Sequence, residues 1–184
     1  MDLNANPNRK EVEAKIARSG DYVKMDYLQA CLKKQLDFDT KRFVMLKLAT
    51  IYESRRIFLE AAKLMRNVAD INTTNEGKVN DFAKSMDLFI KSGNYSEAEL
   101  SLKKAIAVAT DTQKVALKLR MKELFKAQAK EYLAKDKRKH AVETYEKMLE
   151  IGLNPLERRE VQNALLQLYQ KLGRVQDYYS LEKT

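Results

Sequence analysis

The sequence has 184 residues, of which 45% are hydrophobic and 33% are charged. This length corresponds to about one domain and is sufficient to bury a hydrophobic core. A single cysteine, Cys31, and a single histidine, His140, exclude a disulfide framework and a Cys/His metal cluster. The longest apolar run, residues 105–109, is too short to span a membrane, and residues 1–4 do not resemble a secretory signal. These features favour a cytoplasmic protein.

The positive charge is concentrated in one segment. The formal net charge is +9, and residues 111–140 contribute +6 of it, with 10 basic and 4 acidic side chains. Such a segment can attract nucleic acid, an anionic membrane or an acidic protein. It can also simply be the solvated face of a long helix.

Apolar residues recur at intervals of three and four along nearly the whole chain, as in residues 46–69, which is the period of an α-helix. Short polar segments interrupt this pattern and predict ten helices and no strand; these breaks are residues 19–21, 37–40, 54–56, 72–77, 92–94, 110–112, 135–137, 152–155 and 172–174. At three of them we expect a glycine in the left-handed conformation that ends many helices, namely Gly20, Gly93 and Gly173. In the break at 152–155, Asn154 is expected to cap a helix that begins at Pro155.

Every second break forms a regular series, at positions 20, 56, 93, 136 and 173, with separations of 36, 37, 43 and 37 residues. The residues around these positions share a similar order of large and small side chains, notably in residues 45–52, 93–98 and 125–132. Small residues recur before and after the breaks and would let two helices of a pair approach closely; they are Ala49, Ala61, Ala98, Ala129 and Ala141. Large residues beside them, Tyr52, Tyr132 and Tyr169, would fill the gap to the next pair.

These patterns resemble the tetratricopeptide repeat, whose first helix reads W-x2-L-G-x2-Y and whose second contains A-x3-F. The resemblance implies an all-α, right-handed superhelical solenoid of about five antiparallel helix pairs, forming a single domain over residues 6–184 after a flexible segment 1–5. The expected repeats are approximately 6–38, 39–71, 77–110, 112–153 and 155–184. The first departs from the pattern, because Glu13 occupies the position of the small residue. A generic helical bundle and HEAT-like helix pairs remain alternatives, since the separations exceed the usual repeat length of about 34 residues.

The resemblance also implies that the protein binds rather than catalyses. In this family the first helix of each pair lines a concave groove that holds a peptide. The expected groove residues are Thr50, Glu53, Asn80, Lys84, Asp87, Lys91, Lys126, Lys130, Asn163 and Gln167. No nucleotide-binding, metalloprotease or hydrolase motif is present, so we predict no catalytic residue, no cofactor and no metal ion.

A row of lysines forms the most distinct local feature. They recur every four residues and continue into the next break, and we call the whole set the basic ridge: Lys114, Lys118, Lys122, Lys126, Lys130, Lys135, Lys137, Arg138 and Lys139. The predicted function is a non-catalytic protein-interaction scaffold or adaptor, for which an acidic peptide is the favoured partner. The alternatives are a helical repeat that binds nucleic acid through residues 114–139 and a structural subunit of a larger assembly.

The last predicted helix would leave an apolar face partly uncovered, formed by Val175, Tyr178, Tyr179 and Leu181. We call this set the C-terminal apolar face. Tyr178 stands where a small residue is expected. We therefore expect this face to pair with a partner or with a second copy of the chain.

Overall fold

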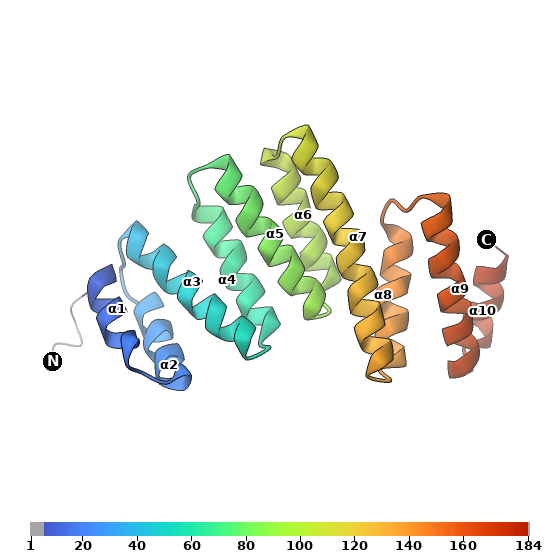
Figure 1. Ribbon diagram of the computed structural model, residues 1–184, viewed down its shortest axis with the longest axis horizontal. Coiled ribbons are helices and arrows are strands. Elements are labelled where there is room, and N and C mark those ends of the chain that lie inside the picture. Colours follow the sequence, from blue (N-terminus) through green and yellow to red (C-terminus); the bar gives the residue numbers. More distant parts are fainter. Residues whose placement is uncertain (1–5, 184) are drawn as a thin grey trace. The chain divides into compact units, whose positions relative to one another are not determined.

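The computed structural model describes residues 6–183, which contain ten α-helices and no β-strand. The prediction of an all-helical chain is thereby confirmed for this part of the protein. The expected flexible segment, residues 1–5, lies outside the described residues. The helices, labelled in Figure 1, are α1 (Arg9–Ala17), α2 (Asp21–Leu32), α3 (Phe38–Ser54), α4 (Phe58–Ile71), α5 (Asn75–Lys91), α6 (Tyr95–Val108), α7 (Asp111–Ala134), α8 (Arg138–Glu150), α9 (Pro155–Leu172) and α10 (Val175–Glu182).

Local side chains determine where several helices begin. The Asn154 side chain accepts a hydrogen bond of 2.8 Å from the backbone N–H of Glu157, and Pro155 is the first residue of α9, as the sequence predicts. Asn8 and Glu11 form a similar capping box at α1. Each cap satisfies a backbone N–H that has no partner within its helix.

Four of the five regular breaks contain a residue with positive φ. Gly93 (φ 76°) and Gly173 (φ 68°) adopt the expected left-handed conformation, and Arg56 (φ 61°) and Asp136 (φ 52°) adopt it without being glycine. The expectation for Gly20 is wrong. Gly20 has φ −72° and is the N-cap of α2, so the extended backbone before a helix, and not the end of a helix, determines its conformation.

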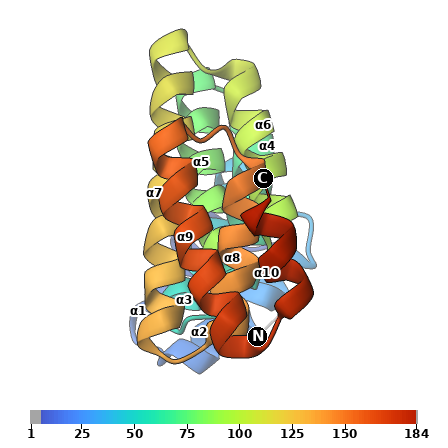
Figure 2. The same cartoon turned by 90° about the vertical axis from the view of Figure 1, so that its right-hand side faces the viewer.

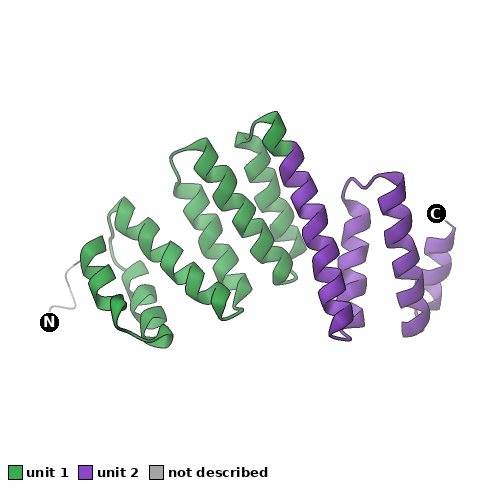
Figure 3. Ribbon diagram, in the orientation of Figure 1, with its two compact units in different colours: residues 1–114 green, residues 115–184 purple. Residues whose placement is uncertain are grey.

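The helices form two compact units, with the boundary in the first turn of α7 (Figure 3). The described residues up to Lys114 make up the first unit, and those from Val115 onward make up the second. Within the first unit, each helix from α1 to α6 packs against the next along the chain, and in the second unit α8 packs against α9 and α9 against α10.

Small side chains lie at the centres of these packed helices. Ala61, Ala98, Ala129 and Ala141 are completely buried, and Ala49 is nearly so. Each lies at a position that the repeat pattern assigns to a small residue. Because an alanine methyl group fills little space, neighbouring helix backbones can approach closely there, while large side chains such as Phe89 fill the remaining core.

Alternate helices lie side by side within each unit. In the first unit, α3 and α5 lie on one side and α4 and α6 on the other; in the second, α7 and α9 lie opposite α8 and α10 (Figure 2). Ion pairs join α3 to α5, α4 to α6 and α7 to α9. Each unit thus has two layers of helices. Side chains from helices of the same layer can share one surface.

Candidate protein-interaction surface

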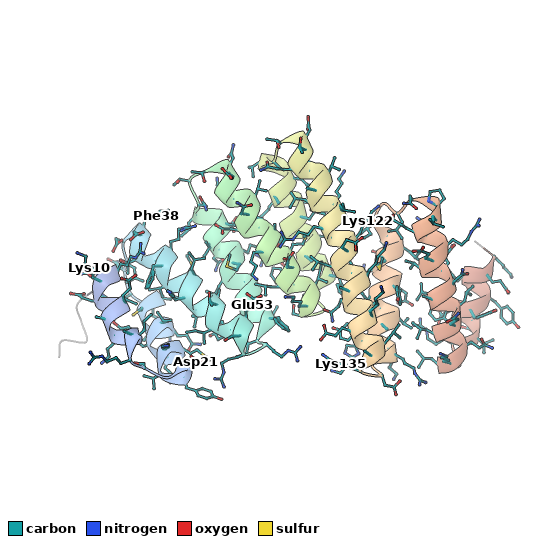
Figure 4. The ribbon with its side chains drawn as sticks, viewed as in Figure 1. Lys10, Asp21, Phe38, Glu53, Lys122 and Lys135 are labelled. Atoms are coloured by element: carbon teal, nitrogen blue, oxygen red, sulfur yellow. The ribbon has the colours of Figure 1, made fainter. Side chains whose placement is uncertain are left out.

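Three of the predicted groove residues meet in the first unit. Lys84 Nζ on α5 lies 2.6 Å from Glu53 Oε1 on α3, and Lys91 Nζ lies 3.8 Å from the same oxygen. Glu53, labelled in Figure 4, is located near the end of α3. One carboxylate of α3 therefore forms ion pairs with two ammonium groups of α5. The cluster keeps an excess of one positive charge.

A similar cluster occurs in the second unit. Lys122 Nζ on α7 lies 2.9 Å from Glu157 Oε2 on α9, and Lys126 Nζ lies 3.8 Å from Oε1 (Lys122 is labelled in Figure 4). The hydrogen bond from Lys122 is the main cause that lowers the pKa of Glu157, and the backbone N–H of Asn154 adds to it. Again two lysines share one carboxylate between alternate helices.

The other predicted groove residues differ in exposure. Five of them are exposed: Thr50, Asn80, Lys130, Asn163 and Gln167. The Thr50 hydroxyl donates a hydrogen bond of 2.9 Å to the Leu46 carbonyl. Asp87 is only 8% exposed, so it is part of the interior and does not line an open surface. We use the name odd-helix face for the exposed or half-buried groove residues of each unit: Thr50, Glu53, Asn80, Lys84 and Lys91 in the first, and Lys126, Lys130, Asn163 and Gln167 in the second.

The basic ridge is not a row of free cations. Besides Lys122 and Lys126, Lys114 pairs with Asp111 at 2.9 Å, and this contact lowers the pKa of Asp111. Lys135 pairs with Glu131, and Arg138 pairs with Asp136 at 2.9 Å. Four ridge residues are exposed and have no ion-pair partner in the described part of the chain: Lys118, Lys130, Lys137 and Lys139. About half of the ridge is therefore neutralised by the protein itself.

Two of the tyrosines that the sequence places between helix pairs form hydrogen bonds to a neighbouring pair through their hydroxyls. The Gln29 amide on α2 donates a hydrogen bond to the Tyr52 hydroxyl on α3, and the Tyr169 hydroxyl on α9 donates one of 2.8 Å to Glu146 on α8. Both hydroxyls therefore contact the preceding helix. Burial, with the hydrogen bond to Glu146, raises the pKa of Tyr169.

Ion pairs also join the even-numbered helices α4 and α6, and they are not among the contacts predicted from the sequence. Asp70 on α4 pairs with Lys104 on α6 at 2.8 Å, and Arg66 on α4 pairs with Glu97 on α6. A signal was present in the sequence, because opposite charges recur at about the repeat distance, 34 and 31 residues apart in these two pairs.

One surface hollow includes Thr50 of the odd-helix face, and another includes residues of the C-terminal apolar face. The first, of about 380 Å³, lies in the first unit and is lined by four apolar residues, which we call its floor (Ile16, Ala17, Phe43 and Ile51), and by four polar residues, which we call its rim (Glu13, Lys24, Lys47 and Thr50). The second, of about 320 Å³, lies in the second unit and is lined by Tyr169, Gln170, Gly173, Val175, Tyr178 and Tyr179.

The C-terminal apolar face is partly exposed. Val175 is 60% exposed and Tyr179 is 56% exposed, whereas Tyr178 and Leu181 are half-buried. No residue of α10 is fully buried. The rings of Tyr178 and Tyr179 contact each other edge to face, with 5.6 Å between their centres.

The two residues with the most reactive side chains have ordinary environments. His140 is exposed and stacks at a tilt on Tyr132, with 5.2 Å between ring centres. Cys31 is 2% exposed, and burial raises the pKa of its thiol. Within residues 6–183, no group of three or more His, Cys, Asp or Glu side chains is arranged to hold a metal ion, and no helix combines the length and apolar character needed to cross a membrane.

No protein family model matches the sequence, and no curated protein matches it.

Proposed function

We propose that this protein is a non-catalytic interaction scaffold, built from five tetratricopeptide-like helix pairs in a right-handed superhelix, that holds a peptide segment of a partner protein on its odd-helix faces. The proposed location is the cytoplasm. The fold part of the proposal rests on the buried alanines at matching repeat positions and on the four left-handed residues at matching breaks. Stacked pairs of this kind leave one helix of each pair available for an extended ligand.

The ion pairs between alternate helices are the observation that carries the proposed function. Glu53 fastens α3 to α5, and Glu157 fastens α7 to α9, each through two lysines. Within each unit, these contacts hold polar side chains of two odd-numbered helices in one surface. A peptide laid across such a surface meets a spaced series of hydrogen-bonding groups and excess ammonium groups.

The charge on these faces favours an acidic partner. Each cluster has two lysines for one carboxylate, and Lys130 is exposed without an ion-pair partner in the described residues. Nucleic acid is a less suitable ligand, because five ridge residues are already paired with the protein's own carboxylates. Binding to a phosphate backbone needs several free cations.

Capture from a lysate of the source cells tests this function. The full chain is immobilised, the lysate is treated with nuclease, and retained proteins are eluted at increasing salt. We expect that a partner protein is retained after nuclease treatment and that it stays bound at moderate salt concentration. Capture that is lost on nuclease treatment, with affinity that falls steeply on a log–log plot against salt, would establish nucleic-acid binding instead.

We also propose a structural role for the C-terminal apolar face, as the docking surface for a second copy or a subunit of an assembly. The exposure of Val175 and Tyr179 favours it, because exposed aromatic and aliphatic side chains on one helix mark many interaction sites. Light scattering of the purified chain and of the Val175→Ser/Tyr179→Ser double variant tests self-association. A dimer that the variant abolishes is expected, and a monomer in both samples at micromolar concentration would exclude self-association.

A further inference from the structure

The hollow in the first unit lies among α1, α2 and α3. Ile16 and Ala17 come from α1, Lys24 comes from α2, and Phe43 and Ile51 come from α3. Its volume of about 380 Å³ is near the lower end of the range for ligand pockets. The size suits one or two side chains of a peptide.

The hollow coincides with a departure from the repeat pattern. At the position of the small residue, α3 has Ala49 and α7 has Ala129, and both are buried. In α1 the same position holds Glu13, whose side chain is exposed on the rim. Burying an unpaired carboxylate is costly, so Glu13 stays at the surface and leaves a hollow beside α1. The accessible apolar residues of this hollow are Ala17, which is exposed, and Ile51, which is half-buried, whereas Ile16 and Phe43 are each only 8% exposed.

The rim carries excess positive charge. The Glu13 carboxylate lies 3.3 Å from Arg9, which also pairs with Asp39 at 3.2 Å. Lys24 and Lys47 have no ion-pair partner within the described residues. The Lys47 ammonium lies 5.6 Å from the centre of the Phe43 ring. The hollow is thus bordered by two unpaired ammonium groups and by the Glu13 carboxylate, which is paired with Arg9. The two unpaired ammonium groups beside apolar residues are complementary to an apolar side chain flanked by acidic residues.

We propose that this hollow anchors a partner's acidic segment: a large apolar side chain packs on the accessible part of the floor, at Ala17 and Ile51, and flanking Asp or Glu carboxylates pair with Lys24 and Lys47. This inference rests on the proposed function, for which it names the anchor site and the ligand chemistry. It also assigns a role to Lys24 and Lys47, which the repeat pattern does not place among the groove residues.

The test uses a labelled peptide with one Leu between Glu residues, acetylated and amidated so that all its carboxylates belong to side chains. Fluorescence anisotropy measures its binding to the full chain. We expect the Lys24→Gln/Lys47→Gln variant to bind roughly tenfold more weakly, because it loses two ion pairs at the protein surface. The matched control, Lys10→Gln/Lys41→Gln, removes the same charge from exposed positions of α1 and α3 outside the hollow and should bind normally.

A second pair of variants tests the apolar floor. Ala17→Phe fills the hollow and should abolish binding, whereas Ala14→Phe places the same ring on α1 away from it and should not. Circular dichroism shows that each variant is folded. Absence of binding to the wild-type chain, or equal binding by a peptide with Ala in place of Leu, would overturn the inference. Tight binding that none of the variants alters would place the acidic ligand elsewhere, which overturns the inference and leaves the proposed function standing.

Discussion

Lys122 on α7 donates a hydrogen bond of 2.9 Å to Glu157 on α9, 35 residues further along the chain. Glu157 also accepts a hydrogen bond from the Asn154 backbone N–H, so one carboxylate both caps α9 and fastens it to α7. In the first unit Glu53 joins α3 to Lys84 on α5. Part of the lysine charge therefore stabilises the protein, and only the remainder is available for a ligand.

Replacing Glu157 by Gln should lower the denaturant midpoint at neutral pH. Gln retains a hydrogen-bonding group at this capping position but loses the attraction to Lys122 and Lys126. The pKa of Glu157 in the folded protein lies below its usual value of 4.5. The ion pairs therefore stabilise the fold fully at pH values above the pKa that Glu157 has in the unfolded chain. This contribution disappears as pH falls through the lower, folded-state pKa.

The midpoints of the wild-type chain and the variant should therefore converge in acid. Glu160→Gln removes an exposed carboxylate one turn along α9 and is the control, with little change expected at any pH. A difference between the wild-type chain and Glu157→Gln that persists at the lowest pH would contradict the assigned ion pairs.

Replacing Gly173 by Ala should destabilise the second unit by about 1 kcal/mol, since a Cβ is unfavourable in left-handed backbone. Gly173 has φ +68° and open space around it, so the cost comes from the backbone alone. Gly152 also has open space but no positive φ, and its replacement by Ala should be neutral or slightly stabilising. Urea denaturation of both variants measures the difference, and equal midpoints would show that the conformation of Gly173 is wrongly assigned.

Replacing Ala129 by Leu should cost about 1–3 kcal/mol, because overpacking displaces neighbouring side chains. Ala129 is completely buried in α7, and Ala127 two residues earlier is exposed. Ala127→Leu should therefore change stability by less than about 0.5 kcal/mol. Thermal melts followed by circular dichroism provide the measurement. Tolerance of Leu at both positions would argue against close helix packing at Ala129.

The Cys31 thiol should not react in the native protein. It is 2% exposed, and burial raises its pKa, so both access and the thiolate fraction are small. Ellman's reagent should label Cys31 only after denaturant is added. Rapid labelling in native buffer would mean that α2 opens readily.

Patterns within a few residues allowed much of the fold to be predicted. Asn154 and Pro155 define the start of α9 by contacts within one turn, and the three- and four-residue apolar spacing needs no knowledge of the tertiary structure. Gly20 illustrates the limit of such patterns. Glycine suits both a helix end and an N-cap, and the identity of the residue alone does not distinguish them.

Interactions between distant residues were harder to predict. The sequence placed Glu53, Lys84 and Lys91 on one surface, but it did not reveal that they pair, because rotamers and helix spacing decide which ammonium reaches the carboxylate. The repeat position of Asp87 predicts a groove residue, yet its side chain is buried. A small rotation of a helix moves such a side chain from the surface to the interior.

Partner capture by two triple variants tests the central claim most directly. Thr50→Glu/Asn80→Glu/Asn163→Glu adds three negative charges to the odd-helix faces, and Ala30→Glu/Asn67→Glu/Ala107→Glu adds the same charge to exposed positions of α2, α4 and α6. The account predicts that the first variant loses the partner retained by the wild-type chain and that the second keeps it. Retention by the first variant, or equal loss by both, would contradict binding on the odd-helix faces.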